Sequence, residues 1–430
     1  MVNVSETSRN LIDQQSSMQF SKSKPWLELL REDGINAFIN DGLPDTDVEK
    51  WKYTNLNQLG GISGERSPKV AVNQNQISWL LNEVETNKLV FVNGYFQKSL
   101  SKIIDVGEGI QISPLCDELL NSDFIQDYLG KIGSSADNPL FALNTAFIED
   151  GCFISIENCK LVKPIEVIYI SNSSDATCHH PRNIILARNN AEINIIERHV
   201  GLCDEAYISN GATEILAEGG SGINHYRLFE DTVNGTNLSS VKAIVKDHSY
   251  YNSFVLSSGG RLTRCEIDVS CAGEGAKTSL NGVYIARDKQ HMDHTTSVQH
   301  LVPNTTSIEN YRGALDGNSR GVFQGSIVVE EGADGTDGRM SNKNILLSSK
   351  AEVNAKPQLE IYADDVQCAH GCTVGELDDE ALFYLRSRGI CEQDARAMLV
   401  EGFLNEALSG IPEQAFLDIF QSKIKGWMVV

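Results

Sequence analysis

Two cysteines and a histidine stand on alternate residues of one extended segment near the end of the sequence. They are Cys368, His370 and Cys372, and an acidic stretch from 359 to 365 leads into them. Side chains two residues apart on a strand point to the same face, so these three can converge on one point. Two sulfur atoms and an imidazole suit zinc, copper or iron–sulfur chemistry. The alternative is a buried strand end whose cysteines pack as small apolar residues.

The composition describes a large, acidic, globular protein. Its 430 residues include 36 basic and 58 acidic side chains, which gives a formal net charge of −22. This balance argues against nucleic acid as the main partner, because phosphate binding needs a basic face. No run reaches the roughly 18 apolar residues of a membrane helix, and the polar first 25 residues lack the apolar core of a signal peptide. With ten scattered cysteines, we expect reduced thiols and a cytoplasmic location.

The elements that must position these residues follow from the pattern of the chain. Residues 1–25 predict a polar disordered leader, and residues 26–150 predict a mostly helical domain. Short β-rich runs separated by Gly, Asn, Asp and Ser turns fill residues 151–366. Pairs of these runs recur about every 24 to 31 residues, which favours a parallel β-helix over a β-sandwich. Residues 367–430 predict a C-terminal helical domain.

Other patterns are weaker candidates for chemistry. The stretch 271–278 ends in Lys-Thr like a P-loop but lacks the signature glycines, so a turn between strands is the preferred interpretation. The histidine pairs at 179–180 and 291–294 lack zinc-like partners, which favours turn histidines. The acidic loop 332–338 resembles half of a calcium-binding repeat, and a single copy is weak evidence for a calcium site.

A β-helix is also a fold that cleaves polysaccharides, with acidic residues gathered in a groove. Acidic residues on the predicted strands are spread along the sequence, at Glu197, Glu214, Glu230, Asp268 and Glu309. Because residues far apart in the sequence can meet in space, a polysaccharide-cleaving enzyme is the main catalytic alternative.

Three segments resemble one known family. The block VQCAHGCTVGELDDEALFYLRSRGI (366–390) closely resembles the signature of the SufB/SufD family of iron–sulfur cluster scaffolds. GLPDTDVEKWKYTNL (42–56) resembles the family's N-terminal element, and NPLFALNTAFIEDGCFI (138–154) resembles its entry into the core. SufB typically has Cys-Glu-His at this site and a longer N-terminal region. This chain has Ala369 there and is identified with the SufD branch, with a SufB-type paralogue as the alternative.

The resemblance implies a fold and a role. The fold is mainly β with α: a right-handed parallel β-helix flanked by N-terminal and C-terminal helical domains. The role is a non-catalytic scaffold that pairs with SufB through the end strands of the two β-helices. Its C-terminal helices, residues 378–430, would dock the ATPase SufC, and this chain itself would bind no nucleotide. End strands of this kind can also pair with themselves, which would give a homodimer of the isolated chain.

The resemblance also assigns roles to the three residues of the extended segment. The family's interface histidine maps onto His370, which would be a ligand of a transient iron–sulfur cluster shared with SufB. Cys368 maps onto the cysteine of the motif and is a further ligand candidate. Cys372 stands where the family more often has a small residue, so a packing role is at least as good an interpretation for it.

Overall fold

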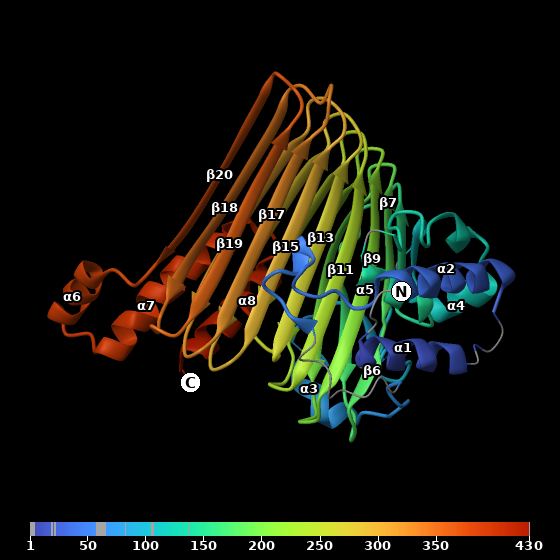
Figure 1. Ribbon diagram of the computed structural model, residues 1–430, viewed down its shortest axis with the longest axis horizontal. Coiled ribbons are helices and arrows are strands. Elements are labelled where there is room, and N and C mark those ends of the chain that lie inside the picture. Colours follow the sequence, from blue (N-terminus) through green and yellow to red (C-terminus); the bar gives the residue numbers. More distant parts are fainter. Residues whose placement is uncertain are drawn as a thin grey trace.

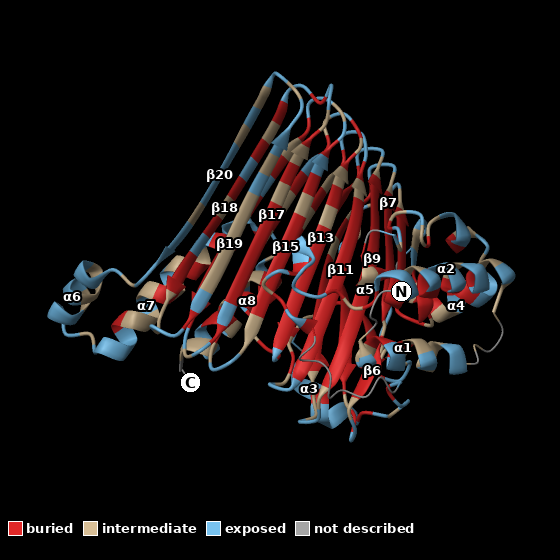
Figure 2. Ribbon diagram, viewed as in Figure 1, coloured by how far each residue is buried: buried red, intermediate tan, exposed pale blue. Residues whose placement is uncertain are grey.

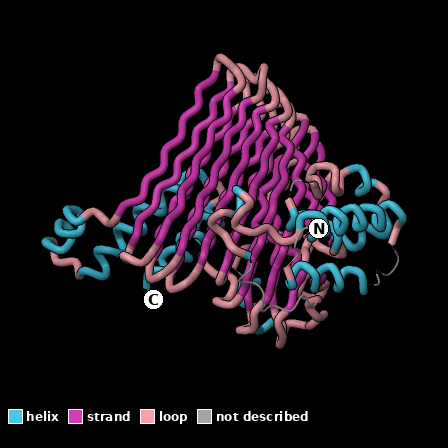
Figure 3. The backbone as a smooth tube through the Cα atoms, viewed as in Figure 1, coloured by secondary structure: helices cyan, strands magenta, loops and turns pink. Residues whose placement is uncertain are grey.

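Strands wind along one axis through most of the molecule. The computed structural model describes residues 5–18, 20, 23–56, 66–81, 83–104, 107–136 and 138–429. Its strands form a β-solenoid of about eight turns, in which successive strands alternate between two sheets (Figure 1). The tube view shows the strands slanting side by side along the solenoid, with helices at both of its ends (Figure 3). The predicted fold, a β-helix with flanking helices, is confirmed.

Within the described residues each sheet contains ten strands, and we name the first the even-numbered sheet and the second the odd-numbered sheet after most of their strands. The first runs through β2 (Tyr95–Phe96), β1 (Asn87–Val92), β5 (Ile165–Ser171), β8 (Glu192–Gly201), β10 (Gly222–Glu230), β12 (Tyr250–Ser257), β14 (Lys277–Ala286), β16 (Thr306–Leu315), β18 (Thr336–Leu346) and β20 (Val366–Gly375). The second runs through β3 (Ile110–Pro114), β4 (Cys152–Glu157), β7 (Arg182–Arg188), β9 (Tyr207–Glu218), β11 (Gly235–Val245), β13 (Leu262–Cys271), β15 (His291–His300), β17 (Arg320–Val329) and β19 (Glu352–Ile361), and β6 (Thr177–His179) pairs with β9.

The repeat is uneven in length but constant in register. Neighbouring strands from β4 and β5 onward pair in parallel, and one turn separates Thr236 from Leu262, whereas a longer one separates Arg320 from Glu352. The predicted interval of about 24 to 31 residues therefore falls close to the observed offsets. Inward-facing side chains stack from turn to turn into one apolar core that runs from Leu89 on β1 to Ala351. This core holds the solenoid together, because each turn contacts only its neighbours.

Helices from the N-terminal part cover the outer face of the odd-numbered sheet. Apolar residues of α2 and α5, such as Phe38 and Leu140, pack there against Ile208 and Leu238 on the strands. The helical elements are α1 (Glu6–Ser17), α2 (Pro25–Asp41), η1 (Glu49–Trp51), η3 (Gln74–Ile77), α3 (Ser78–Leu81), α4 (Leu115–Asn121), η4 (Phe124–Asp127) and α5 (Pro139–Ala146). Because a strand covered on both sides has no solvent face, β7 and β9 are buried almost throughout (Figure 2).

The C-terminal helices differ in how they contact the even-numbered sheet. Phe416 and Phe420 of α8 (Gln414–Val429) pack on Tyr226 and Phe254 of the even-numbered sheet, together with α7 (Glu392–Asn405) and η5 (Glu406–Gly410). In contrast, α6 (Asp379–Ser387) has no buried residue and projects away from the solenoid (Figure 1). Within the described part of the chain, no helix has both the length and the apolar character needed to cross a membrane.

Two predicted boundaries are corrected by these elements. The predicted disordered leader contains α1, which Ser5 caps and which buries Leu11 against the N-terminal helices. The few apolar residues of α1 are enough to hold it in place, because the other N-terminal helices supply the apolar residues that it packs against. At the other end, the solenoid continues past residue 366, since β20 pairs with β18 as far as Gly375. The segment after 26 also supplies strands, because β1 pairs in parallel with β5.

Candidate functional site at the open end of the solenoid

The alternating residues of the sequence motif lie on β20, the last strand of the even-numbered sheet. Each stands beside an inward-facing, buried residue of the preceding strand β18, and the pairs are Cys368 with Gly338, His370 with Met340, and Cys372 with Asn342. Equivalent positions on successive turns share one side of the sheet. The three side chains therefore continue the interior column of the solenoid onto its final turn, on one face as the spacing predicts.

No further turn covers this face among the residues that the structure describes. His370 is exposed, whereas Cys368 and Cys372 are half-buried. The companion strand β19 is half-buried or exposed along its length, although β17 beside it is almost fully buried. Figure 2 shows this change from red to tan and pale blue over the last two strands. The solenoid thus ends with two strand edges that have no neighbour, which is the geometry that another chain can extend.

The two thiols differ in their surroundings. Burial raises the pKa of Cys368, and a backbone hydrogen bond from Gly338 works in the opposite direction. Its sulfur packs against the end of the apolar core. Burial also raises the pKa of Cys372, which lies close to the Tyr284 hydroxyl in the polar part of the interior. Both thiols are therefore held protonated more strongly than a solvated cysteine, until a metal or a cationic partner arrives.

The chain does not contain a full set of metal ligands in this region. No group of three or more His, Cys, Asp or Glu side chains in the described residues is arranged to hold a metal ion. Alternate residues on a strand are roughly 6.6 Å apart along the backbone, so the row of three stays spread out. The convergence on one point that the spacing allows is thus absent from the single chain. Among the described residues, the row therefore offers three separate donors instead of a closed metal site.

Of the histidines interpreted as turn residues, His179, His291 and His294 lie on strands, and His180 directly follows β6. His294 on β15 is fully enclosed, and burial lowers its pKa to about 3. Burial likewise lowers the pKa of His180 to about 3, and its Nε2 lies 3.0 Å from the sulfur of Cys178. This thiol–imidazole contact has the same Cys-x-His spacing as Cys368 and His370, a signal that the sequence analysis missed. Cys178 is buried and His180 is half-buried and stacked on Phe147, so the contact contributes to packing under the N-terminal helices.

The acidic residues of the catalytic alternative do not gather in one groove. Each has its own partners on a different turn: Glu197 with His199 and His225, Glu214 with Arg182, Glu230 with Arg198 and Lys423, Asp268 with Lys242, and Glu309 with Thr296. Burial alone would raise the pKa of Glu197, but hydrogen bonds from His199 and His225 hold it well below its usual range. These acidic residues are therefore separated from one another in the folded structure, as they are in the sequence.

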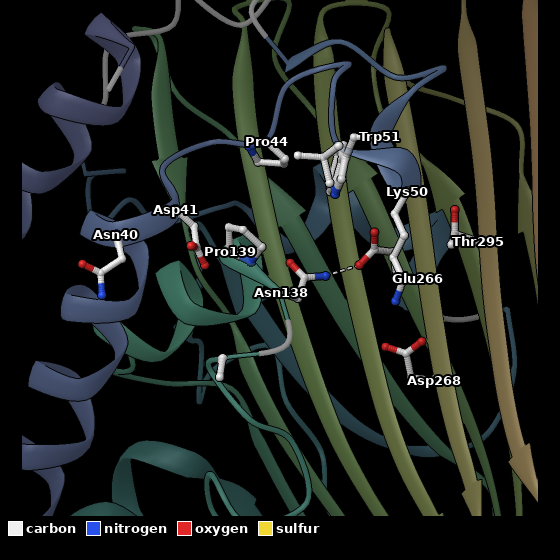
Figure 4. A pocket seen from close by; sticks show the side chains of 12 residues that line it. Asn40, Asp41, Pro44, Lys50, Trp51, Asn138, Pro139, Glu266, Asp268 and Thr295 are labelled. Carbon is white, nitrogen blue, oxygen red and sulfur yellow. Dashed lines mark hydrogen bonds between the residues drawn. The ribbon is translucent and has the colours of Figure 1, made fainter. Parts of the chain in front are cut away.

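One cavity does bring two strand carboxylates together, and a third carboxylate, Asp41 of α2, also lines it. It has a volume of about 390 Å³ and lies between the segment around Trp51 and the outer face of β13, where Glu266 and Asp268 face it (Figure 4). Glu266 accepts hydrogen bonds from Arg264 and Asn138, and Asp268 is paired with Lys242. A general acid must carry a proton to its substrate. The two strand carboxylates are instead bonded to basic side chains, which makes them poorly suited to the acid and base roles of glycoside cleavage.

Comparison with known proteins decides the family. The description "SUF system FeS cluster assembly, SufBD core domain" matches residues 169–403, and "SufBD protein N-terminal region" matches residues 2–167. The chain belongs to the SufBD family. The two matched regions meet at β5, where the first complete turns of the SufBD solenoid begin.

Several curated relatives of this SufBD chain resemble it over most of its length. The iron–sulfur cluster assembly protein SufD of Escherichia coli is 31% identical over 90% of this chain and 91% of its own. An iron–sulfur cluster assembly SufBD family protein of Synechocystis is 28% identical over 86% of this chain and 84% of its own. The SufD protein of Bacillus subtilis is 22% identical over 96% of this chain and 98% of its own. The resemblance found in the sequence motifs is thereby confirmed.

Proposed function

We propose that this SufBD protein is a non-catalytic scaffold subunit, which builds a nascent iron–sulfur cluster together with SufB. The observation that carries the proposal is the uncovered last turn of the solenoid, with His370 exposed and Cys368 half-buried on its inward face. The chain has imidazole and thiol donors there but no complete ligand set among its described residues. The names of its relatives, which are iron–sulfur cluster assembly proteins, give the chemistry that such a half-site would serve.

The partner that fits the open end best is another solenoid of the same family. Strand edges of β19 and β20 offer main-chain hydrogen bonds, and a second SufBD solenoid presents a matching cross-section. SufB, the other branch of the family, is the partner we infer. Its end strands would cover the inward face of β20 and enclose Cys368 and His370 between the two subunits. Without SufB, the same edges would favour a homodimer.

The donors at the interface have distinct roles in this proposal. His370 supplies a neutral imidazole ligand, since it is exposed and points toward the missing turn. Cys368 supplies a thiolate once iron displaces its proton, because a metal offsets the burial that raises the pKa of the thiol. Cys372 lies beside Asn342 and close to Tyr284, where it completes the polar interior. We therefore assign Cys372 to packing.

The remaining parts of the chain divide the work of the complex. We infer that the ATPase SufC docks on the helices after residue 378, and that its hydrolysis supplies the movement that opens and closes the SufB interface. This chain has no P-loop of its own, as the turn between β13 and β14 occupies the stretch 271–278. The N-terminal part of the chain covers the outer face of the odd-numbered sheet, reaches the last turn through the Glu49–Lys356 ion pair, and leaves the strand edges of that turn to SufB.

Replacement of His370 with Ala tests the ligand assignment. The variant should be co-expressed with SufB and SufC, and the iron and sulfide content of the purified complex should fall at least several-fold. Complex formation should be unchanged, because His370 is exposed and its replacement leaves the main-chain hydrogen-bonding groups of the strand edge in place. His248→Asn is a matched control, since His248 is an exposed histidine in a remote turn and Asn tolerates its left-handed backbone.

The cysteine variants separate the two thiols in the same assay. Cys368→Ser should lower the cluster content, whereas Cys372→Ser should retain it if Cys372 only packs. Wild-type iron and sulfide in the His370→Ala complex, together with normal maturation of a client protein, would contradict the proposed ligand.

A further inference from the structure

Among the described residues, four arginine side chains are fully buried. Three of them are paired with carboxylates: Arg182 with Glu214, Arg198 with Glu83 and Glu230, and Arg264 with Glu266 and Asp293. The fourth is Arg227, which forms no ion pair with a carboxylate in the described part of the chain. A buried charge is normally paired, because the interior of a protein solvates it poorly. Arg227 is therefore the exception within this fold.

The guanidinium of Arg227 has more hydrogen-bond donors than it uses. Arg227 lies on β10 and reaches across the interior to the opposite sheet, where one terminal nitrogen donates to the Ser239 hydroxyl of β11 over 3.0 Å. Its Nε and its other terminal nitrogen are buried and have no hydrogen-bond partner among the described residues. Unpaired donors on a charged group cost more than those on a neutral one. The arrangement therefore calls for an acceptor beside Arg227.

Two carboxyl groups stand on the interior face of the same sheet, and neither bonds Arg227. Glu197 is the register partner of Arg227 on β8, but its two oxygens lie 2.8 Å from Nε2 of His199 and 3.1 Å from Nε2 of His225. Glu309 lies further along the sheet on β16, where burial raises its pKa to about 8 and keeps it protonated at neutral pH. The guanidinium thus lacks a bonded counter-ion within the described part of the chain.

Tyr311 approaches the same part of the interior from the other side. It follows Val255 and Gly282 in the register column of Arg227, three strands further along the sheet. A side-chain carbon added at Gly282 would collide with the Tyr311 ring, so the ring lies back over β14 in the direction of Arg227. The Tyr311 hydroxyl is buried and has no hydrogen-bond partner among the described residues. A second unused donor is therefore directed toward the guanidinium.

Cys265 and His294 close this part of the interior from the opposite sheet. They follow Ser239 in its register column, on β13 and β15. Burial raises the pKa of the Cys265 thiol to about 12, and the charge of Arg227 is the largest influence in the opposite direction. The ring of His294 lies 5.4 Å from that of Tyr311, and its Nδ1 is a further buried atom without a partner in the described chain. All of these side chains are enclosed, so only a small ligand can lie between them.

We propose that Arg227 and Tyr311 hold one chloride ion inside the solenoid. Chloride accepts hydrogen bonds from N–H and O–H donors alike, and its charge offsets that of the guanidinium. A water molecule would bring two protons of its own, for which a guanidinium offers no acceptor. The enclosure favours a spherical ion over a larger, polyatomic anion. Neither the motif on β20 nor the proposed role in cluster assembly enters this argument.

Urea unfolding of the full chain tests the site when sodium chloride replaces sodium isethionate at constant ionic strength, since isethionate is too large for an enclosed site. Chloride should raise the free energy of unfolding by up to about 1.4 kcal/mol for each tenfold increase in its concentration. Arg227→Met should abolish this dependence. Tyr311→Phe should weaken the affinity for chloride about tenfold, the loss expected for one hydrogen bond to an ion. Arg9→Met is the matched control, because Arg9 is exposed on α1, and it should keep the full dependence.

Crystals of the full chain grown in sodium bromide give a reading that does not depend on any variant. Anomalous scattering should place one bromide between the guanidinium of Arg227 and the hydroxyl of Tyr311. Equal stability of the wild type in chloride and isethionate would overturn the proposal, as would the absence of bromide at this position. A chloride dependence that persists in Arg227→Met would place the ion elsewhere and overturn it too. If Arg227→Met does not fold, Tyr311→Phe and the bromide position decide.

Discussion

Glu309 is a carboxyl group inside the solenoid with part of its hydrogen-bonding capacity unused. One of its oxygens accepts a hydrogen bond of 2.5 Å from Thr296, and the other is buried without a partner. Burial raises the pKa of Glu309 to about 8. The side chain is therefore protonated in the folded protein at neutral pH. The unfolded chain would lose this proton much earlier, near the ordinary pKa of 4.5.

This difference predicts a pH-dependent cost to stability. Below the unfolded pKa both states hold the proton, and as the pH rises toward the folded pKa the unfolded state gains free energy from ionisation. Glu309→Gln removes the titration while keeping the shape. The variant should match wild type near pH 4.5 and exceed it in free energy of unfolding by at least about 1.4 kcal/mol at pH 8.5, which corresponds to one pKa unit. Urea unfolding at both pH values measures this, and a pH-independent difference would contradict the raised pKa.

The sequence predicted correctly which residues of the candidate site share a face, but it did not predict the surroundings of the other histidines. The shared face of Cys368, His370 and Cys372 follows from the two-residue period of a strand, and the structure has it. Histidines 291 and 294 were interpreted as turn residues because they lack partners at zinc-like spacing, yet they lie on β15. Polar residues can enter a solenoid strand because partners arrive from the next turn, about 30 residues away, and no local pattern records those partners.

Among the elements, α2 and α5 make an unusually close contact. A side-chain carbon added at Gly34 of α2 would lie 2.8 Å from the backbone nitrogen of Ala146 and 2.9 Å from the carbonyl oxygen of Ala142. The backbone of a packed helix cannot move aside as a flexible side chain can. Gly34 is therefore required for the approach of the two helices, even though glycine is a poor helix former.

Gly34→Ala and Gly402→Ala should have opposite effects on stability. Alanine is favoured over glycine in a helix by about 1 kcal/mol, but overpacking at Gly34 costs about 1–3 kcal/mol and should lower the urea midpoint. Gly402 on α7 has no neighbouring atom within 4 Å of the added carbon, so its variant should gain up to about 1 kcal/mol. A stabilised Gly34→Ala protein would refute the contact between α2 and α5.

The prediction of elements was best where the pattern repeats. Alternating runs between turn residues located the solenoid strands, since every turn reuses the same two-strand unit. The leader was interpreted wrongly because α1 has little apolar surface of its own and depends on α2 and on the residues after it. The end of the solenoid was placed too early, at residue 366, although the segment through Cys372 was itself predicted to be extended.

On the scale of the whole molecule, the solenoid has two different ends. The N-terminal part of the chain closes the beginning, whereas the last turn is open and α6 projects beside it (Figure 1). Phe383 and Tyr384 on α6 are 75% and 57% exposed. Large aromatic side chains exposed on a helix without buried residues are typical of an interface. This surface is the one we propose for the ATPase.

Replacement of Phe383 and Tyr384 with Ser tests the docking surface. The double variant should weaken capture of SufC at least tenfold in a pull-down and leave pairing with SufB unchanged. Leu29→Ser is the control, since Leu29 is 62% exposed on α2. Undiminished capture of SufC would exclude α6. Point variants are preferable to deletion of residues 378–430, because Phe416 and Phe420 belong to the apolar core on the even-numbered sheet.

The three-part organisation could be predicted because each part has its own period in the sequence. The half-built nature of the β20 site could be argued only from its place at the end of a repeat. A polar cavity lined by Arg261, Lys289 and Arg320 could not be predicted, because these residues come together only when three turns stack in register. Residues some 30 positions apart carry no local signal of that meeting.

The free edge of β20 can pair with an added strand only in a set of discrete alignments. Strands pair in whole-residue steps, so an added strand can occupy only a ladder of alternative alignments. A slip of one residue would put Ala369 or Gly371 in the place of His370. A slip of two residues would keep His370 on the same face but displace its imidazole by roughly 6.6 Å. In the proposed complex, hydrogen bonds between the strand edges would therefore allow only discrete alignments. Only one of these alignments would bring His370 opposite its intended partner residue.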